Sequence, residues 1–110
     1  REAFQAAQKA YVQRTLYNDT VQRVSKATGY DLNGAGPAVR QVTYSTAVQH
    51  GGTGGARVMT EAIRRADQKL KRTDARYKEA LVDATYDRRT EIFLVSSKRN
   101  KILADEQDKL

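Results

Sequence analysis

The chain has 110 residues, of which 20 are Lys or Arg and 13 are Asp or Glu, and its net charge is +7. It contains no cysteine, which excludes disulfides and thiolate metal sites. No apolar run reaches the roughly 18 residues that a membrane-spanning helix needs, and no signal peptide is recognisable. This length supports one domain, residues 1–110, with a single modest core. Because the chain begins with Arg1 and its only methionine is Met59, we expect it to be part of a longer protein.

The first third of the sequence predicts two helices and a loop. Residues 2–16 are rich in alanine, and their apolar side chains recur at helical spacing. Asn18 or Asp19 is suited to cap a second helix over residues 19–28, which a glycine follows. Residues 30–36, YDLNGAG, contain turn residues and precede a proline, so they predict a loop that leads into the next helix.

The remaining two thirds predict longer helices. A third helix over 37–49 should end at the glycine-rich stretch 51–55, and a fourth over about 55–71 has a single clean apolar face. A fifth helix is expected from about residue 74 to 95, followed by a short terminal helix after a pair of serines. No run alternates apolar and polar residues as a strand would. We therefore predict an all-α fold of about five to six helices.

Residues 41–56 contain no charged side chain, although the chain as a whole is 30% charged. Apolar residues occur on several sides of the helix predicted over 37–49, which is typical of a central helix. Its residues Ser45, Thr46 and Gln49 follow helical spacing, so they share one neutral edge. Two interpretations remain open: the hydroxyls bond to backbone carbonyls inside the core, or the edge lines a cleft suited to a polyhydroxylated ligand such as a sugar.

Other motifs in this region predict no catalytic chemistry. His50, the only histidine, has no second His or Cys with which to bind zinc, so we expect neither a metal nor another cofactor. The GGTGG stretch lacks the Gly-Lys-Ser/Thr of a phosphate-binding loop and follows a helix rather than a strand. The carboxylates available as a catalytic acid stand in polar, charged surroundings that would not raise a pKa. They are Asp19, Asp31, Glu61, Glu79 and Glu91.

Basic residues gather in the second half of the chain. Residues 57–78 hold eight Lys or Arg against three acidic residues, which favours a polyanionic partner such as nucleic acid or a bacterial envelope polymer. A solvated helix face explains the same pattern. Arg88 and Arg89 lie on or beside the apolar face of the long helix, so one of them is expected to be partly buried and paired.

Three segments carry a resemblance to a known family. AAQKAYVQRTLYND (6–19), TGYDLNGAGPAVRQVTYSTAVQHG (28–51) and ALVDATYDRRTEIF (80–93) resemble the C-terminal half of chitosanase-like lysozyme domains. These domains occur in phage lytic enzymes and in peptidoglycan-cleaving effectors of type VI secretion, often fused to spike proteins. The resemblance implies a two-lobed α-rich fold, and this chain would be one helical lobe.

The resemblance also implies an activity and a division of labour. The family hydrolyses the β-1,4 bond between N-acetylmuramic acid and N-acetylglucosamine. Its catalytic carboxylates lie in a segment that nothing in this chain matches, so they are expected upstream of residue 1, and this chain alone is expected to be inactive. Only the role of lining the substrate cleft is assigned here, to Ser45, Thr46, Gln49, His50, Tyr86 and Arg89.

The resulting expectation is a muramidase whose cleft this chain completes. Its partners would be peptidoglycan glycan strands, the rest of the same domain, and a secretion spike or an immunity protein, with no membrane contact. It would act in the bacterial periplasm and cell wall after delivery by a secretion system or phage. The alternatives are a basic helical module that binds nucleic acid or another polyanion, and a structural segment without a ligand. Nucleic acid is less favoured because Tyr77 is the only aromatic residue near the basic segment.

Overall fold

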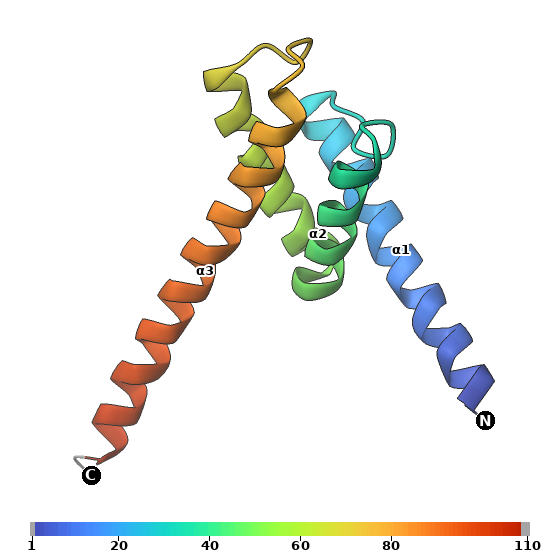
Figure 1. Cartoon of the computed structure of the whole chain (residues 1–110). Coiled ribbons are helices and arrows are strands. Elements are labelled where there is room, and N and C mark those ends of the chain that lie inside the picture. The colour runs from blue at the N-terminus through green and yellow to red at the C-terminus, as the bar shows by residue number, and fades with distance from the viewer. Residues whose placement is uncertain (1, 109–110) are drawn as a thin grey trace.

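The computed structural model describes the backbone of residues 2–108 and the side-chain surroundings of residues 10–97. Within residues 2–108 the chain forms helices and loops but no strand, which confirms the all-α prediction. It has three helices rather than five to six: α1 (Glu2–Thr28), α2 (Pro37–Lys69) and α3 (Tyr77–Asp108). Figure 1 shows α2 folded back on itself between α1 and α3, which diverge from it on either side. No helix in this range is both long and apolar enough to cross a membrane.

Helix α1 is continuous where two helices were predicted. Asn18 and Asp19 lie inside it rather than at a cap. Asp19 is satisfied there by an ion pair with Arg23, one turn later, at 2.9 Å. The next residue, Thr20, is fully buried and donates a hydrogen bond to the carbonyl of Gly52 in α2 at 3.2 Å. Asn and Asp cost only about 0.7 kcal/mol inside a helix, and this tertiary packing outweighs that cost.

The loop between α1 and α2 confirms the sequence prediction. Gly29 ends α1 with a positive φ of 72°, and Gly36, with a φ of 100°, precedes Pro37 at the first turn of α2. Inside the loop, the carboxylate of Asp31 accepts a hydrogen bond from the backbone N–H of Asn33 at 3.1 Å. This Asx turn stabilises the loop without any ligand.

Helix α2 is broken once, at Gly51. This residue has φ 79° and ψ 172°, whereas its neighbours on both sides are helical. The helix therefore consists of two arms, residues 37–50 and 52–69, which run back along each other (Figure 1). The glycine-rich stretch 51–55 was predicted to end the helix, but only Gly51 departs from helical dihedral angles. Gly55 serves a different purpose, because a Cβ there would lie 3.0 Å from the Cα of Ala47 in the first arm.

Helix α3 runs on through Ser96 and Ser97, where an interruption was predicted, and it includes Ile102 and Leu103. Serine lowers helix propensity by only about 0.5 kcal/mol, and neither glycine nor proline is present to end the helix. At the other end, the carboxylate of Asp74 accepts a hydrogen bond from the backbone N–H of Arg76 at 2.8 Å. The helix itself begins at Tyr77, three residues after the start that was predicted near residue 74.

The core lies along α2, which contacts both of the other helices, while within the described residues α1 and α3 do not contact each other. The apolar face predicted for the second arm is confirmed. The largest fully buried apolar side chains are Val24 of α1, Leu32 of the loop, Val39, Met59 and Ile63 of α2, and Tyr77 and Leu81 of α3. Further along α3 the apolar side chains are exposed because the helix extends beyond α2, and Val95 is 61% accessible.

Two of the polar contacts between α3 and α2 involve the second arm of α2 and an acidic side chain. Arg65 forms a bidentate ion pair with Glu91, with N–O distances of 2.6 and 2.8 Å. The buried Tyr77 donates its hydroxyl to Asp67 at 2.7 Å. Burial and the Asp67 carboxylate both raise the pKa of Tyr77 above its ordinary value. A half-exposed ion pair such as Arg65–Glu91 contributes at most about 1 kcal/mol to the free energy of unfolding. It therefore orients α3 more than it stabilises the fold.

Candidate functional site

Arg89 of α3 gathers three of the residues selected from the sequence. Its guanidinium donates to the hydroxyl of Ser45 at 3.3 Å and to the side-chain carbonyl of Gln49, both on the first arm of α2. It also lies over the ring of Tyr86, one turn earlier in α3, at 5.6 Å from the centroid. We call these four residues the Arg89 cluster. The cluster is accessible, and Tyr86 is 53% exposed.

Thr46 does not belong to this cluster because its side chain lies in the core. Its side chain is fully buried, and its hydroxyl donates to the carbonyl of Val42 at 2.7 Å. Successive residues of a helix are about 100° apart, so Thr46 faces the core while Ser45 and Gln49 face outward. The two interpretations of this edge therefore divide between residues: Thr46 bonds to the backbone and is inaccessible to a ligand, and the other two are accessible.

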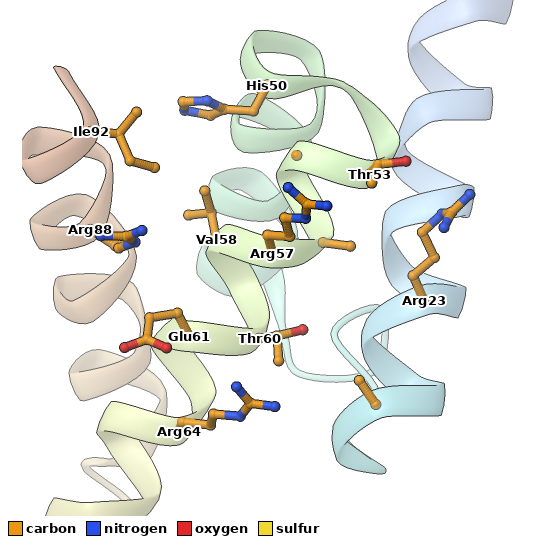
Figure 2. Close-up of a pocket in the computed structure, with 13 residues that line it drawn as sticks. Arg23, His50, Thr53, Arg57, Val58, Thr60, Glu61, Arg64, Arg88 and Ile92 are labelled. Carbon is orange, nitrogen blue, oxygen red and sulfur yellow. The ribbon is translucent and has the colours of Figure 1, made fainter. Parts of the chain in front are cut away.

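His50 is the last residue before the break at Gly51. In Figure 2 its imidazole extends from the turn of α2 toward Ile92 of α3. Its Nε2 atom is buried and has no hydrogen-bond partner. Burial, and secondarily the positive charge of Arg89, lower the pKa of His50 below its ordinary value of 6.5. The imidazole is therefore neutral at pH 7 and adjoins the Arg89 cluster through its neighbour in sequence, Gln49.

An open groove of about 740 Å³ lies beside His50, over the second arm of α2 and between α1 and α3 (Figure 2). We call it the arginine groove. Residues that line it include Arg23 of α1, Arg57, Glu61 and Arg64 of α2, and Arg88 of α3. The groove thus contains four guanidinium groups and one carboxylate.

Sequence reasoning identified the basic segment but not this groove. The repeat of Thr53, Arg57, Thr60 and Arg64 at helical spacing was the available signal. The walls of the groove come from α1 and α3, which are distant in sequence from the second arm of α2. Sequence spacing therefore could not show that they face the same groove. Arg65, in the same segment, lies outside the groove and pairs with Glu91.

The two arginines predicted to lie near the apolar face are both half-buried. Arg88 lies 3.8 Å from Glu91, so the carboxylate that it meets comes from one turn later in its own helix. Arg89 bonds instead to the neutral side chains of the Arg89 cluster. The prediction of a partly buried, paired arginine is therefore confirmed for Arg88.

Three carboxylates of the described residues have a lowered pKa because a cation or a backbone donor binds them. Arg65 lowers the pKa of Glu91 through hydrogen bonds, and Arg72 does the same for Asp67. The backbone N–H of Arg76 lowers the pKa of Asp74. A general acid needs a shift in the opposite direction. Among the residues whose side chains are described, no group of three His, Asp or Glu is arranged to hold a metal ion.

Comparison with known families identifies a match over nearly the whole chain. The model of the family described as type VI secretion system spike protein VgrG3-like, C-terminal, matches residues 1–109. A search of curated proteins and a search of solved structures each found no match.

Proposed function

The chain belongs to the family of VgrG3-like C-terminal domains of type VI secretion spike proteins, and from this premise we propose that it binds glycan strands of peptidoglycan. In this proposal it is the cleft-lining lobe of a lysozyme-type hydrolase that a spike delivers to the periplasm of a target bacterium. The catalytic carboxylates belong to another part of the protein. An immunity protein would protect the producing cell.

The Arg89 cluster is the observation that carries the proposal. It combines an exposed aromatic ring, Tyr86, with hydroxyl, amide and guanidinium groups from Ser45, Gln49 and Arg89. A sugar ring has an apolar face that packs on an aromatic ring and hydroxyls that bond to neutral or planar polar groups. Two helices supply these groups, and the Arg65–Glu91 ion pair fixes the helices against each other, so the site is preorganised.

The charge pattern of the carboxylates supports assigning catalysis elsewhere. A glycoside hydrolase needs one carboxyl group with a raised pKa facing a second carboxylate across the scissile bond. Glu91 is held ionised by Arg65, and Asp19 is paired with Arg23. The hydrogen bonds from Arg65 lower the pKa of Glu91 and stabilise its charged form, which cannot protonate a leaving group.

Titration with chitotetraose, followed by amide NMR shifts, tests the glycan site. We expect shifts at residues 45–50 and 86–89. Tyr86→Ala should weaken binding about fivefold, as expected from about 1 kcal/mol of aromatic packing, while Tyr86→Phe should retain it. Tyr11→Ala is the matched control because Tyr11 is also an exposed tyrosine, at 67% against 53% for Tyr86, but lies on α1. Equal losses in Tyr86→Ala and Tyr11→Ala, or no shifts at the cluster, would refute the site.

The hydrolase itself is tested on the intact spike protein that carries this domain. We expect it to release new reducing ends from purified peptidoglycan, and Tyr86→Ala to reduce the rate. Glycan binding without release of reducing ends would leave the domain as a binding module and contradict the enzymatic part of the proposal.

A further inference from the structure

The floor of the arginine groove contains positive charge that no carboxylate of residues 10–97 neutralises in an ion pair. Arg57 and Arg64 are seven residues apart and project from the same face of the second arm of α2 (Figure 2). Both are exposed. Among the described residues, neither forms an ion pair with a carboxylate. An anion that enters the groove therefore meets two guanidinium groups with free donors.

The walls add two further guanidinium groups that have weak or exposed partners. Arg23 on the α1 side pairs with Asp19 at 2.9 Å, but both side chains are about half exposed. Arg88 on the α3 side lies 3.8 Å from Glu91, a carboxylate that Arg65 already binds in bidentate fashion. Guanidinium groups bind carboxylates and phosphates through pairs of parallel hydrogen bonds. The groove is thus suited to a ligand with more than one oxyanion.

Other lining groups favour carboxylates on a peptide over a nucleic-acid backbone. Glu61 lies among the arginines and is contacted by Arg65 at the long distance of 3.4 Å. Its carboxylate would repel a polyphosphate but could bind the ammonium group of a zwitterionic ligand. The hydroxyls of Thr53 and Thr60 can bond to peptide groups. Among the described residues no Phe, Tyr or Trp lines the groove, so a base would find only the imidazole of His50 on which to stack.

The groove and the Arg89 cluster adjoin along the chain. His50 lines the groove and follows Gln49 of the cluster, and Arg88 lines it and precedes Arg89. Peptidoglycan is a glycan strand whose sugars carry short peptides with both carboxylates and an amine. We propose that the arginine groove binds these acidic peptide branches while the Arg89 cluster holds the glycan. The inference rests on the proposed function and adds the peptide as a second element of recognition.

The test compares three probes by calorimetry and amide NMR: chitotetraose, the free stem tripeptide, and the disaccharide tripeptide. The double variant Arg57→Gln with Arg64→Gln removes both floor arginines. It should weaken binding of the disaccharide tripeptide at least about tenfold and leave the affinity for chitotetraose unchanged. The matched control is Arg14→Gln with Arg40→Gln, which removes the same charge from exposed positions outside the groove. Its effect should stay below about twofold. Circular dichroism verifies that both variants are folded.

The outcomes separate the two proposals. If chitotetraose binds and the tripeptide probes do not depend on Arg57 and Arg64, the peptide groove is refuted and the glycan site stands. If the free tripeptide shifts the amide signals of residues 57–64 and chitotetraose shifts no signal of the Arg89 cluster, the glycan site is refuted and the peptide groove is supported. A duplex oligonucleotide that binds through the same two arginines more tightly than the tripeptide would overturn the inference in favour of nucleic acid.

Discussion

Substituting Gly51 with alanine tests the origin of the bend in α2. Its φ of 79° and ψ of 172° fall in a region that residues with a Cβ essentially do not occupy. A Cβ at this position would have no atom within 4 Å, so the substitution introduces strain but no collision. We expect a strain of about 3 kcal/mol, offset by about 0.7 kcal/mol because alanine also restricts the unfolded chain. The net loss of unfolding free energy is then about 2 kcal/mol.

Thermal and urea unfolding of the two proteins measures this loss. For a chain of this length, about 2 kcal/mol corresponds to a fall in Tm of about 8 °C. Gly54→Ala is the matched control because Gly54 is helical and lies three residues away. Its new Cβ would lie 3.3 Å from the Cβ of His50, and the gain in helix propensity of about 1 kcal/mol should offset this close contact. We expect the control to be as stable as the wild type or slightly more stable.

A third variant distinguishes the type of backbone conformation. Asparagine tolerates the left-handed helical region, where ψ is about 30° to 60°, but Gly51 lies far outside it. Gly51→Asn should therefore be about as unstable as Gly51→Ala. A Tm for Gly51→Ala within about 2 °C of the wild type would show that the bend forms with ordinary dihedrals and would refute the reasoning.

Three further predictions concern packing and charge. Met59→Ala should lower the free energy of unfolding by about 2–5 kcal/mol in urea denaturation, because the side chain is fully buried and leaves a cavity; a loss below about 1 kcal/mol would contradict this packing. Gly55→Ala should destabilise by about 1–3 kcal/mol, because its Cβ would lie 3.0 Å from the Cα of Ala47, and an unchanged Tm would show that the two arms can separate without cost. Arg72 lowers the folded-state pKa of Asp67 below 3.8, so this carboxylate stabilises the fold above that pH and loses the contribution as the pH falls through its folded value. The difference in unfolding free energy between the wild type and Asp67→Asn should therefore become smaller in acid. A difference that becomes larger below pH 3.8 would contradict the assigned direction of the pKa shift.

The candidate site was predictable only in part. Ser45 and Gln49 could be selected because helical spacing places them on one edge of an uncharged helix. Thr46 was selected with them, but a difference of 100° in direction turns it into the core. Spacing shows which residues share a helix face; it does not show which neighbouring helix covers that face.

The sequence by itself determined the helical class, the loop over 29–36 and the apolar face of the second arm of α2. These features depend on local periodicity, glycine and proline, which act over a few residues. It also contained the neutral run and the basic segment.

Only the tertiary structure decided how these pieces combine. Asn18 and Asp19 remain inside one long helix because buried contacts with α2 outweigh their cost in a helix interior, which is about 0.7 kcal/mol each. The single break at Gly51 turns the second arm back along the first. The arginine groove forms where α1 and α3 flank that arm, and their described residues make no contact with each other. Residues such as Arg23 and Arg88 are 65 positions apart, so no local pattern could have placed them on opposite sides of one groove.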